Sequence, residues 1–234
     1  MTSLYGTTRE ELHRIATHVL ARARWSATGR FGLRVVPDGI ATPAFGDAGE
    51  VLRLTPSALL RERQTEGGAR TEALALEGRS LAELARFAGV DLVEGFSVGR
   101  DPPPIGDPDS VVTVEPEAAA GAFRWFALGA RALDVVVASC GEASVVQLWP
   151  EHFDMAVDVK AGSDRVNLGA SAGDGFHDRP YLYVGPWGAE RPGDPGFWNA
   201  PFGAVLGAES FVGRPDDGSD GAVAFLQRGL ELLR

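Results

Sequence analysis

Hydrophobic and polar residues follow two different periods along this chain, and the two periods predict both helices and strands. Four segments have the helical period, in which apolar residues recur every three or four positions. Thr7 and Ser80 each begin a capping-box pattern, with Glu three residues later, and Pro116 is a residue that favours a first helical turn. The predicted helices span residues 7–23, 80–89, 116–138 and 220–233.

Short runs of alternating and β-branched residues lie between these helices and predict strands. In the first half, the predicted strands span residues 32–36, 40–44, 51–55 and 71–76. In the second half, they span residues 144–149, 153–159, 165–168, 181–184 and 204–208. Short strands with few helices between them favour antiparallel sheets over βαβ units. We therefore predict an α+β fold with mostly antiparallel sheets and four helices.

The two halves of the chain have a similar order of predicted elements. Residues 35–40 (VVPDGI) and 148–153 (LWPEHF) each have a proline followed by an acid and then a large apolar residue. Because Pro-acid turns between strands are common, the pattern fits either an internal duplication or two unrelated turns. We predict a single compact unit over residues 1–234. Two pseudo-repeated halves, 1–100 and 111–234, would be joined by the proline-rich connection 101–110.

Composition and charge exclude several classes of protein. The 234 residues carry a net charge of −10, and Lys160 is the only lysine, so we expect no nucleic-acid partner. The strongly apolar runs, such as residues 135–140, are far shorter than the roughly 20 residues of a membrane-spanning helix. A single cysteine, Cys140, forms no intramolecular disulfide and suits a reducing compartment. Since residues 1–8 also lack the basic start of a signal peptide, we expect an acidic, soluble, cytoplasmic protein.

Ionisable residues occupy one side of a predicted strand in the second half. If this strand starts directly after Pro150, alternation places His152, Asp154 and Asp158 on the face opposite the apolar residues. An imidazole and a carboxylate two residues apart can bind a divalent metal ion, or the carboxylate can orient the imidazole as a general base. The alternative is a solvated face of an antiparallel sheet, which is polar for no functional reason.

A second group of polar residues lies in the glycine-rich stretch before the strand predicted at residues 181–184. This stretch has few apolar residues that could form a core. It is followed by tyrosines on one face of the next strand and by tryptophans in Gly/Pro-rich loops. Aromatic side chains around loops can line a small-molecule pocket, or they can pack loops onto the core. The candidate ligand-binding residues are His152, Asp154, Asn167, Ser171, Asp174, His177, Tyr181, Tyr183 and Trp187.

Residues 169–173 (GASAG) match the G-x-S-x-G pattern of a nucleophile elbow. An elbow has to open a helix, whereas the residues that follow have the composition of a loop. His177 is also the last histidine of the chain, so no later histidine completes a triad. We therefore do not expect a serine hydrolase.

Four segments of the second half carry a resemblance to a known family. They are residues 149–154 (WPEHFD), 167–171 (NLGAS), 180–187 (PYLYVGPW) and 197–204 (FWNAPFGA). Together they resemble a family of uncharacterised proteins found chiefly in actinobacteria. The resemblance implies a shared fold and brings no activity or functional residue with it.

These observations leave three interpretations of function. The first is a small-molecule-binding protein with a polar and aromatic pocket in the second half. The second is a metal-assisted hydrolase in which His152 and Asp154 bind a divalent metal and His177 or Asp174 supplies a third ligand or a base. The third is a structural or protein-interaction module, which an exposed apolar patch near Trp187 would favour.

Overall fold

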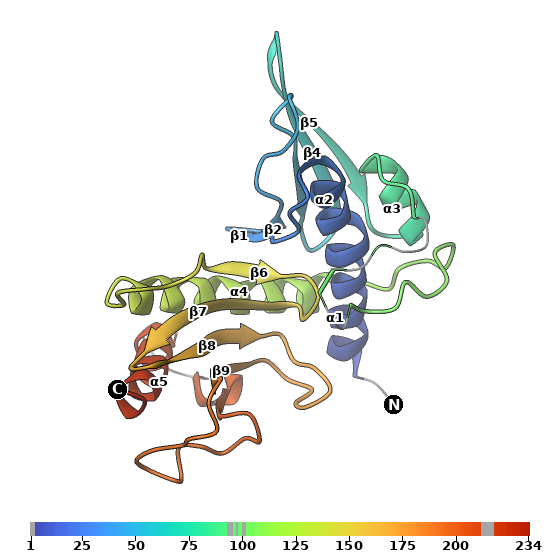
Figure 1. Ribbon diagram of the computed structural model, residues 1–234. Coiled ribbons are helices and arrows are strands. Elements are labelled where there is room, and N and C mark those ends of the chain that lie inside the picture. Colours follow the sequence, from blue (N-terminus) through green and yellow to red (C-terminus); the bar gives the residue numbers. More distant parts are fainter. Residues whose placement is uncertain (1–2, 93–95, 97, 100–101, 212–217) are drawn as a thin grey trace. The chain divides into compact units, whose positions relative to one another are not determined.

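The computed structural model describes residues 3–92, 96, 98–99, 102–211 and 218–234 (Figure 1). It contains two compact units. The first consists of Met1–Arg124 with Leu148–Phe153, and the second of Trp125–Gln147 with Asp154–Arg234. The structure has two five-stranded antiparallel sheets together with the four predicted helices, which confirms the α+β class.

A single long helix with a π-helical middle begins the first unit. Its parts are α1 (Leu4–Ile15), η1 (Ala16–Ala21) and α2 (Arg22–Thr28), and it ends at Gly29, whose φ is 69°. The helix starts at Ser3, whose side chain accepts a hydrogen bond from the Gly6 amide, so the predicted start at Thr7 is wrong. A capping box that starts four residues further on cannot act as a cap once an earlier serine has done so.

The first sheet is a simple meander in the order β1-β2-β3-β4-β5. Its strands are β1 (Arg34–Val36), β2 (Gly39–Ala41), β3 (Val51–Leu54), β4 (Ala58–Thr65) and β5 (Gly68–Ala75). Strand β4 was not predicted, because charged residues on both of its faces hide the alternation. Arg61 pairs with Glu50 and Arg63 with Glu72, each at 2.8 Å. Helix α3 (Leu81–Phe87) follows and begins with the predicted capping box.

The proline-rich connection is held against the N-terminal helix within the first unit. Arg14 donates to the carbonyl oxygens of Ile105 and Asp107, and His18 Nε2 lies 2.8 Å from the Pro103 carbonyl oxygen. Residues 102–110 therefore form part of a packed unit, and residue 101 lies outside the described part of the chain.

The second unit combines a sheet with two long helices. Helix α4 (Pro116–Val137) enters it from the first unit, and α5 (Ser219–Leu232) follows a short 3₁₀ turn, η2 (Ala208–Phe211). The strands of the second sheet are β6 (Gln147–Trp149), β7 (Asp154–Ala161), β8 (Asp164–Ser171), β9 (Tyr181–Pro186) and β10 (Ala204–Gly207), in the order β10-β9-β8-β7-β6. The last two residues of β6 belong to the first unit. Among the described residues, no helix is both long and apolar enough to span a membrane.

The register of this second sheet separates an apolar face from a polar one. Met155 pairs with Ala170 and Ala170 with Leu182, so these three apolar side chains share a face. Helix α4 approaches this face at Gly129, where an added Cβ would lie 2.4 Å from the Ala170 Cβ (Figure 1). Helix α5 approaches it at Gly229, where an added Cβ would lie 2.7 Å from the Val184 side chain. Both helices therefore cover the apolar face.

The order of elements is the same around the two sheets. A long helix precedes each meander, a shorter helix follows it, and a Pro-acid turn joins the first two strands. This arrangement fits the predicted repeat, and the duplication itself stays a prediction.

Candidate functional site

The polar face of the second sheet collects most of the predicted site residues. Asp154 on β7 pairs with Ser171 on β8, which pairs with Tyr181 on β9, so these side chains form one row. Tyr183 lies in the next row, opposite Gly169. We call the group formed by these side chains and the loop residues that contact them the aromatic–acid cluster. Its members are Asp154, Ser171, Asp174, Phe176, His177, Tyr181, Tyr183 and Phe202.

Two tyrosine hydroxyls donate hydrogen bonds to two carboxylates in this cluster. The Tyr183 hydroxyl lies 2.5 Å from Asp154 Oδ2, and the Tyr181 hydroxyl lies 2.6 Å from Asp174 Oδ2. The other oxygen of Asp174 accepts from the amides of Phe176 and His177, which fixes the loop after β8. Hydrogen bonds to charged acceptors are among the stronger ones in proteins, so the four side chains hold a defined geometry.

Burial and the nearby carboxylates keep both phenols in their neutral form. Burial raises the pKa of Tyr183 well above its usual value, and the charge of Asp154 raises it further. Burial likewise raises the pKa of Tyr181, and its hydrogen bond to Asp174 adds to the effect. Both hydroxyls therefore remain hydrogen-bond donors over the physiological pH range.

Four aromatic rings of the cluster form a closed cycle of contacts. The ring centroids of Tyr181 and Phe176 lie 6.1 Å apart, those of Phe176 and Phe202 5.1 Å, and those of Phe202 and Tyr183 6.4 Å. Tyr181 and Tyr183 close the cycle at 6.3 Å. Phe176 is 46% exposed and Phe202 38%, whereas Tyr181 is only 4% exposed. The cycle thus has a buried side on the sheet and an open side toward solvent.

Gly169 leaves the space that the Tyr183 ring occupies. A Cβ added at this glycine would lie 2.3 Å from Tyr183 Cζ and 2.5 Å from its hydroxyl oxygen. The first glycine of the G-x-S-x-G pattern therefore positions a tyrosine. Ser171 ends β8, is buried, and accepts a hydrogen bond from the Gly173 amide, and a loop follows it. This strand-to-loop geometry is not that of a nucleophile elbow.

Replacing Gly169 by alanine is expected to lower the free energy of unfolding by about 2 kcal/mol, because the Tyr183 ring has to leave and its hydrogen bond to Asp154 is lost. Urea denaturation would measure this loss. Gly175→Ala is the control, since no atom lies within 4 Å of a Cβ added there. In a Tyr183→Leu background most of the Gly169→Ala effect should disappear, and an undiminished effect would contradict the proposed contact.

Two predicted residues lie at the other end of the same face. The Trp187 indole N–H donates to Asn167 Oδ1 at 3.0 Å, and Trp187 is 62% exposed. Six strand positions separate Trp187 from Tyr181, a distance of roughly 20 Å in a β-strand. Asn167 and Trp187 therefore form a pair distinct from the aromatic–acid cluster.

Among the predicted site residues, His152 lies neither on this face nor in the loop after β8. Strand β7 begins at Asp154, and His152 belongs to the preceding turn, which is part of the first unit. The turn brings Phe153 to a φ of 52°, so strand alternation does not extend back to Pro150 as predicted. The His152 side chain is 56% exposed, and its Nε2 lies 3.7 Å from Glu151 Oε1.

No metal site is evident in the described part of the chain, where no group of three or more His, Cys, Asp or Glu side chains is arranged to hold an ion. Within the second unit, His177 Nδ1 lies 2.9 Å from the Arg179 carbonyl oxygen, and the centroids of the imidazole and Tyr181 rings lie 5.7 Å apart in a T-shaped arrangement. Metal binding by His152 and Asp154 stays a prediction.

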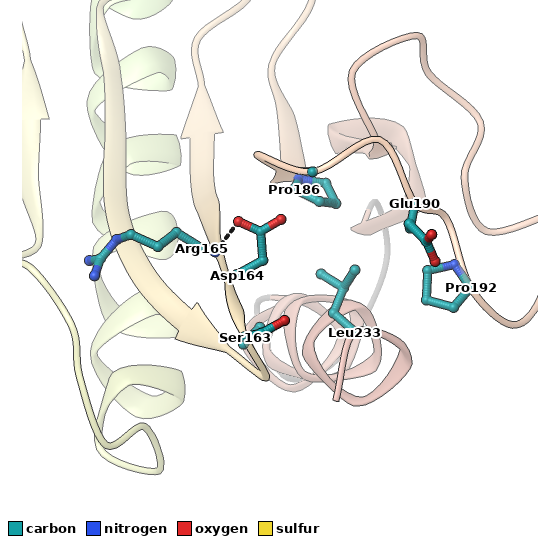
Figure 2. Close-up of a pocket in the computed structure, with 9 residues that line it drawn as sticks. Ser163, Asp164, Arg165, Pro186, Glu190, Pro192 and Leu233 are labelled. Atoms are coloured by element: carbon teal, nitrogen blue, oxygen red, sulfur yellow. Dashed lines mark hydrogen bonds between the residues drawn. The ribbon is translucent and has the colours of Figure 1, made fainter.

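A small cavity of about 220 Å³ lies elsewhere in the second unit. Figure 2 shows Asp164 and Glu190 at its rim and Leu233 reaching into it, while the Arg165 side chain points away. This volume is below that of typical ligand pockets. None of the nine predicted site residues lines it. We therefore regard the aromatic–acid cluster as the stronger candidate.

Two residues of the cluster escaped the sequence-based prediction. Phe176 lies in the glycine-rich loop after β8, and Phe202 lies just before β10. A large aromatic residue next to a glycine was the available signal, because such a residue needs a packing partner. No pattern in the sequence indicates that the partner is a tyrosine pair on the polar side of the sheet.

Comparisons with known proteins add no assignment. The resemblance to an actinobacterial family stays a prediction, and the function has to be inferred from the site itself. No protein-family model, no curated protein and no solved structure matches this chain.

Proposed function

We propose that this protein binds a small organic ligand at the aromatic–acid cluster. The observation that carries the proposal is the closed cycle of four rings, held from below by two tyrosine–carboxylate hydrogen bonds. Ligand sites in proteins combine aromatic surface with a few fixed polar groups, and this cluster has both.

The exposure of the rings favours binding over simple core packing. Phe176 and Phe202 keep 46% and 38% of their surface exposed, although each contacts two other rings of the cycle. Asp154 and Tyr181 beneath them are 6% and 4% exposed. A ligand would therefore meet a preorganised surface, and binding would lose little free energy to ordering of side chains.

The hydrogen bonds of the cluster favour binding over hydrolysis. The Ser171 hydroxyl accepts from the Gly173 amide, and His177 Nδ1 faces the Arg179 carbonyl. Nucleophilic catalysis requires a base within hydrogen-bond reach of the nucleophile. Ser171 also has a hydrogen bond with the Tyr181 side chain, and among the described residues no hydrogen bond joins Ser171 to His177.

A fragment screen by ligand-observed NMR tests the proposal. Fragments that bind the wild-type protein should lose binding in the Phe202→Ala variant and keep it in Trp25→Ala. Trp25 is a matched control because it is 44% exposed and belongs to the first unit. Fragments that bind equally well to wild type and Phe202→Ala, or an absence of binding fragments, would refute the proposed function.

A further inference from the structure

We infer that the ligand of the aromatic–acid cluster carries an alkylammonium group, which would lie on the exposed Phe176 and Phe202 rings beside the Asp174 carboxylate. This inference rests on the proposed function and adds the chemical class of the ligand.

The orientation of the rings suits a cation. Neighbouring rings of the cycle meet at 67°, 73°, 86° and 54°, so they do not stack face to face. Each ring face carries partial negative charge and attracts a cation within about 6 Å of the centroid. Because the exposed Phe176 and Phe202 rings have centroids 5.1 Å apart, a small cation on the open side can contact both rings.

The carboxylates strengthen this preference for positive charge. Each tyrosine hydroxyl donates a hydrogen bond to a carboxylate. This hydrogen bond makes the tyrosine ring more electron-rich. Asp174 is exposed beside the open side of the cycle. In the part of the chain that the structure describes, no arginine or lysine forms an ion pair with Asp174. The Asp174 carboxylate would repel an anionic ligand and attract a cation more strongly than a neutral ligand.

We infer an alkylated rather than a free ammonium group because the rings are apolar. A methylated ammonium group is weakly hydrated and loses little when it leaves water for an aromatic surface. Such a group occurs on free small molecules and on methylated lysine side chains of peptides. Both sources offer the same chemistry to the cluster, and the experiment has to separate them.

The test is a titration of the protein with choline, in which NMR measures the chemical shifts of the protein's aromatic ring protons. The neutral isostere, in which carbon replaces the choline nitrogen, is titrated in parallel, and so is a short peptide with trimethyllysine. We expect choline to bind at least about tenfold more tightly than the isostere. Phe202→Leu should weaken choline binding at least about fivefold and Asp174→Asn by a similar factor, while Trp25→Leu should have no effect.

The outcomes distinguish the ligand class from the proposed function. Equal binding of choline and its isostere, or binding of neutral fragments alone, would overturn the ammonium inference and leave the proposed function intact. Choline binding that survives both Phe202→Leu and Asp174→Asn would place the cation elsewhere and also overturn the inference. Preference for the trimethyllysine peptide over choline would support the inference and identify a protein as the source of the cation.

Discussion

Gly129→Ala is expected to destabilise the protein by about 2 to 3 kcal/mol, although alanine is the better helix former. An added Cβ at this position would lie 2.4 Å from the Ala170 Cβ, and both atoms belong to rigid elements. Either α4 or the sheet has to move, and the contacts along the whole interface loosen. The expected fall in melting temperature is roughly 5 to 10 °C.

The same helix offers the matched control. Gly121 also lies in α4, and an added Cβ there would meet only the end of the Arg124 side chain, at 3.9 Å. Gly121→Ala should therefore show the intrinsic preference of the helix and stabilise the protein by about 0.5 to 1 kcal/mol. Thermal and urea denaturation would measure both variants. If the two substitutions shift stability in the same direction, the close approach of α4 to β8 is contradicted.

Hydrophobic periodicity predicted the strands correctly where a sheet has one apolar face and one polar face. Period two placed Tyr181 and Tyr183 on one side of β9, and the structure puts them on the polar face. Strand β4 shows where this signal ends. Its arginines pair with Glu50, just before β3, and with Glu72 on β5, and a single sequence does not show which residues those partners are.

The site followed from the sequence only in part, for a related reason. Asp154, Asp174 and the two tyrosines were predicted as separate polar and aromatic residues, and their pairing depends on the register of β7, β8 and β9. The place of His152 outside the strand depends on one backbone angle. Phe153 adopts a φ of 52°, which is uncommon for a bulky residue, so the strand starts later than the pattern suggested.

A second large effect is expected from pH, through a histidine of the first unit. His13 Nε2 lies 2.7 Å from the Pro150 carbonyl oxygen, and its ring stacks on Phe153 at 5.2 Å. Burial lowers the pKa of His13 from 6.5 to about 4, with smaller contributions in the same direction from His18 and Arg9. The hydrogen bonds to Pro150 and Glu151 act against this shift.

The sign of the pH effect follows from this lowered pKa. Below pH 6.5 the unfolded chain takes up a proton on His13 before the folded protein does, so stability falls with pH until about pH 4. The gap between the two pKa values corresponds to about 3 kcal/mol. Burial of Glu151 raises the pKa of its carboxyl and opposes the loss, while burial of His18 lowers its pKa and adds to the loss.

Comparison with His13→Gln isolates this contribution, because the other groups are common to both proteins. Glutamine can still donate to the Pro150 carbonyl and has no charge to gain. The stability advantage of the wild type over the variant should shrink by about 3 kcal/mol between pH 7 and pH 4 in urea denaturation. His152→Gln removes a histidine whose side chain is 56% exposed and serves as the control. A parallel loss of stability in the wild type and His13→Gln would show that His13 does not couple protonation to folding.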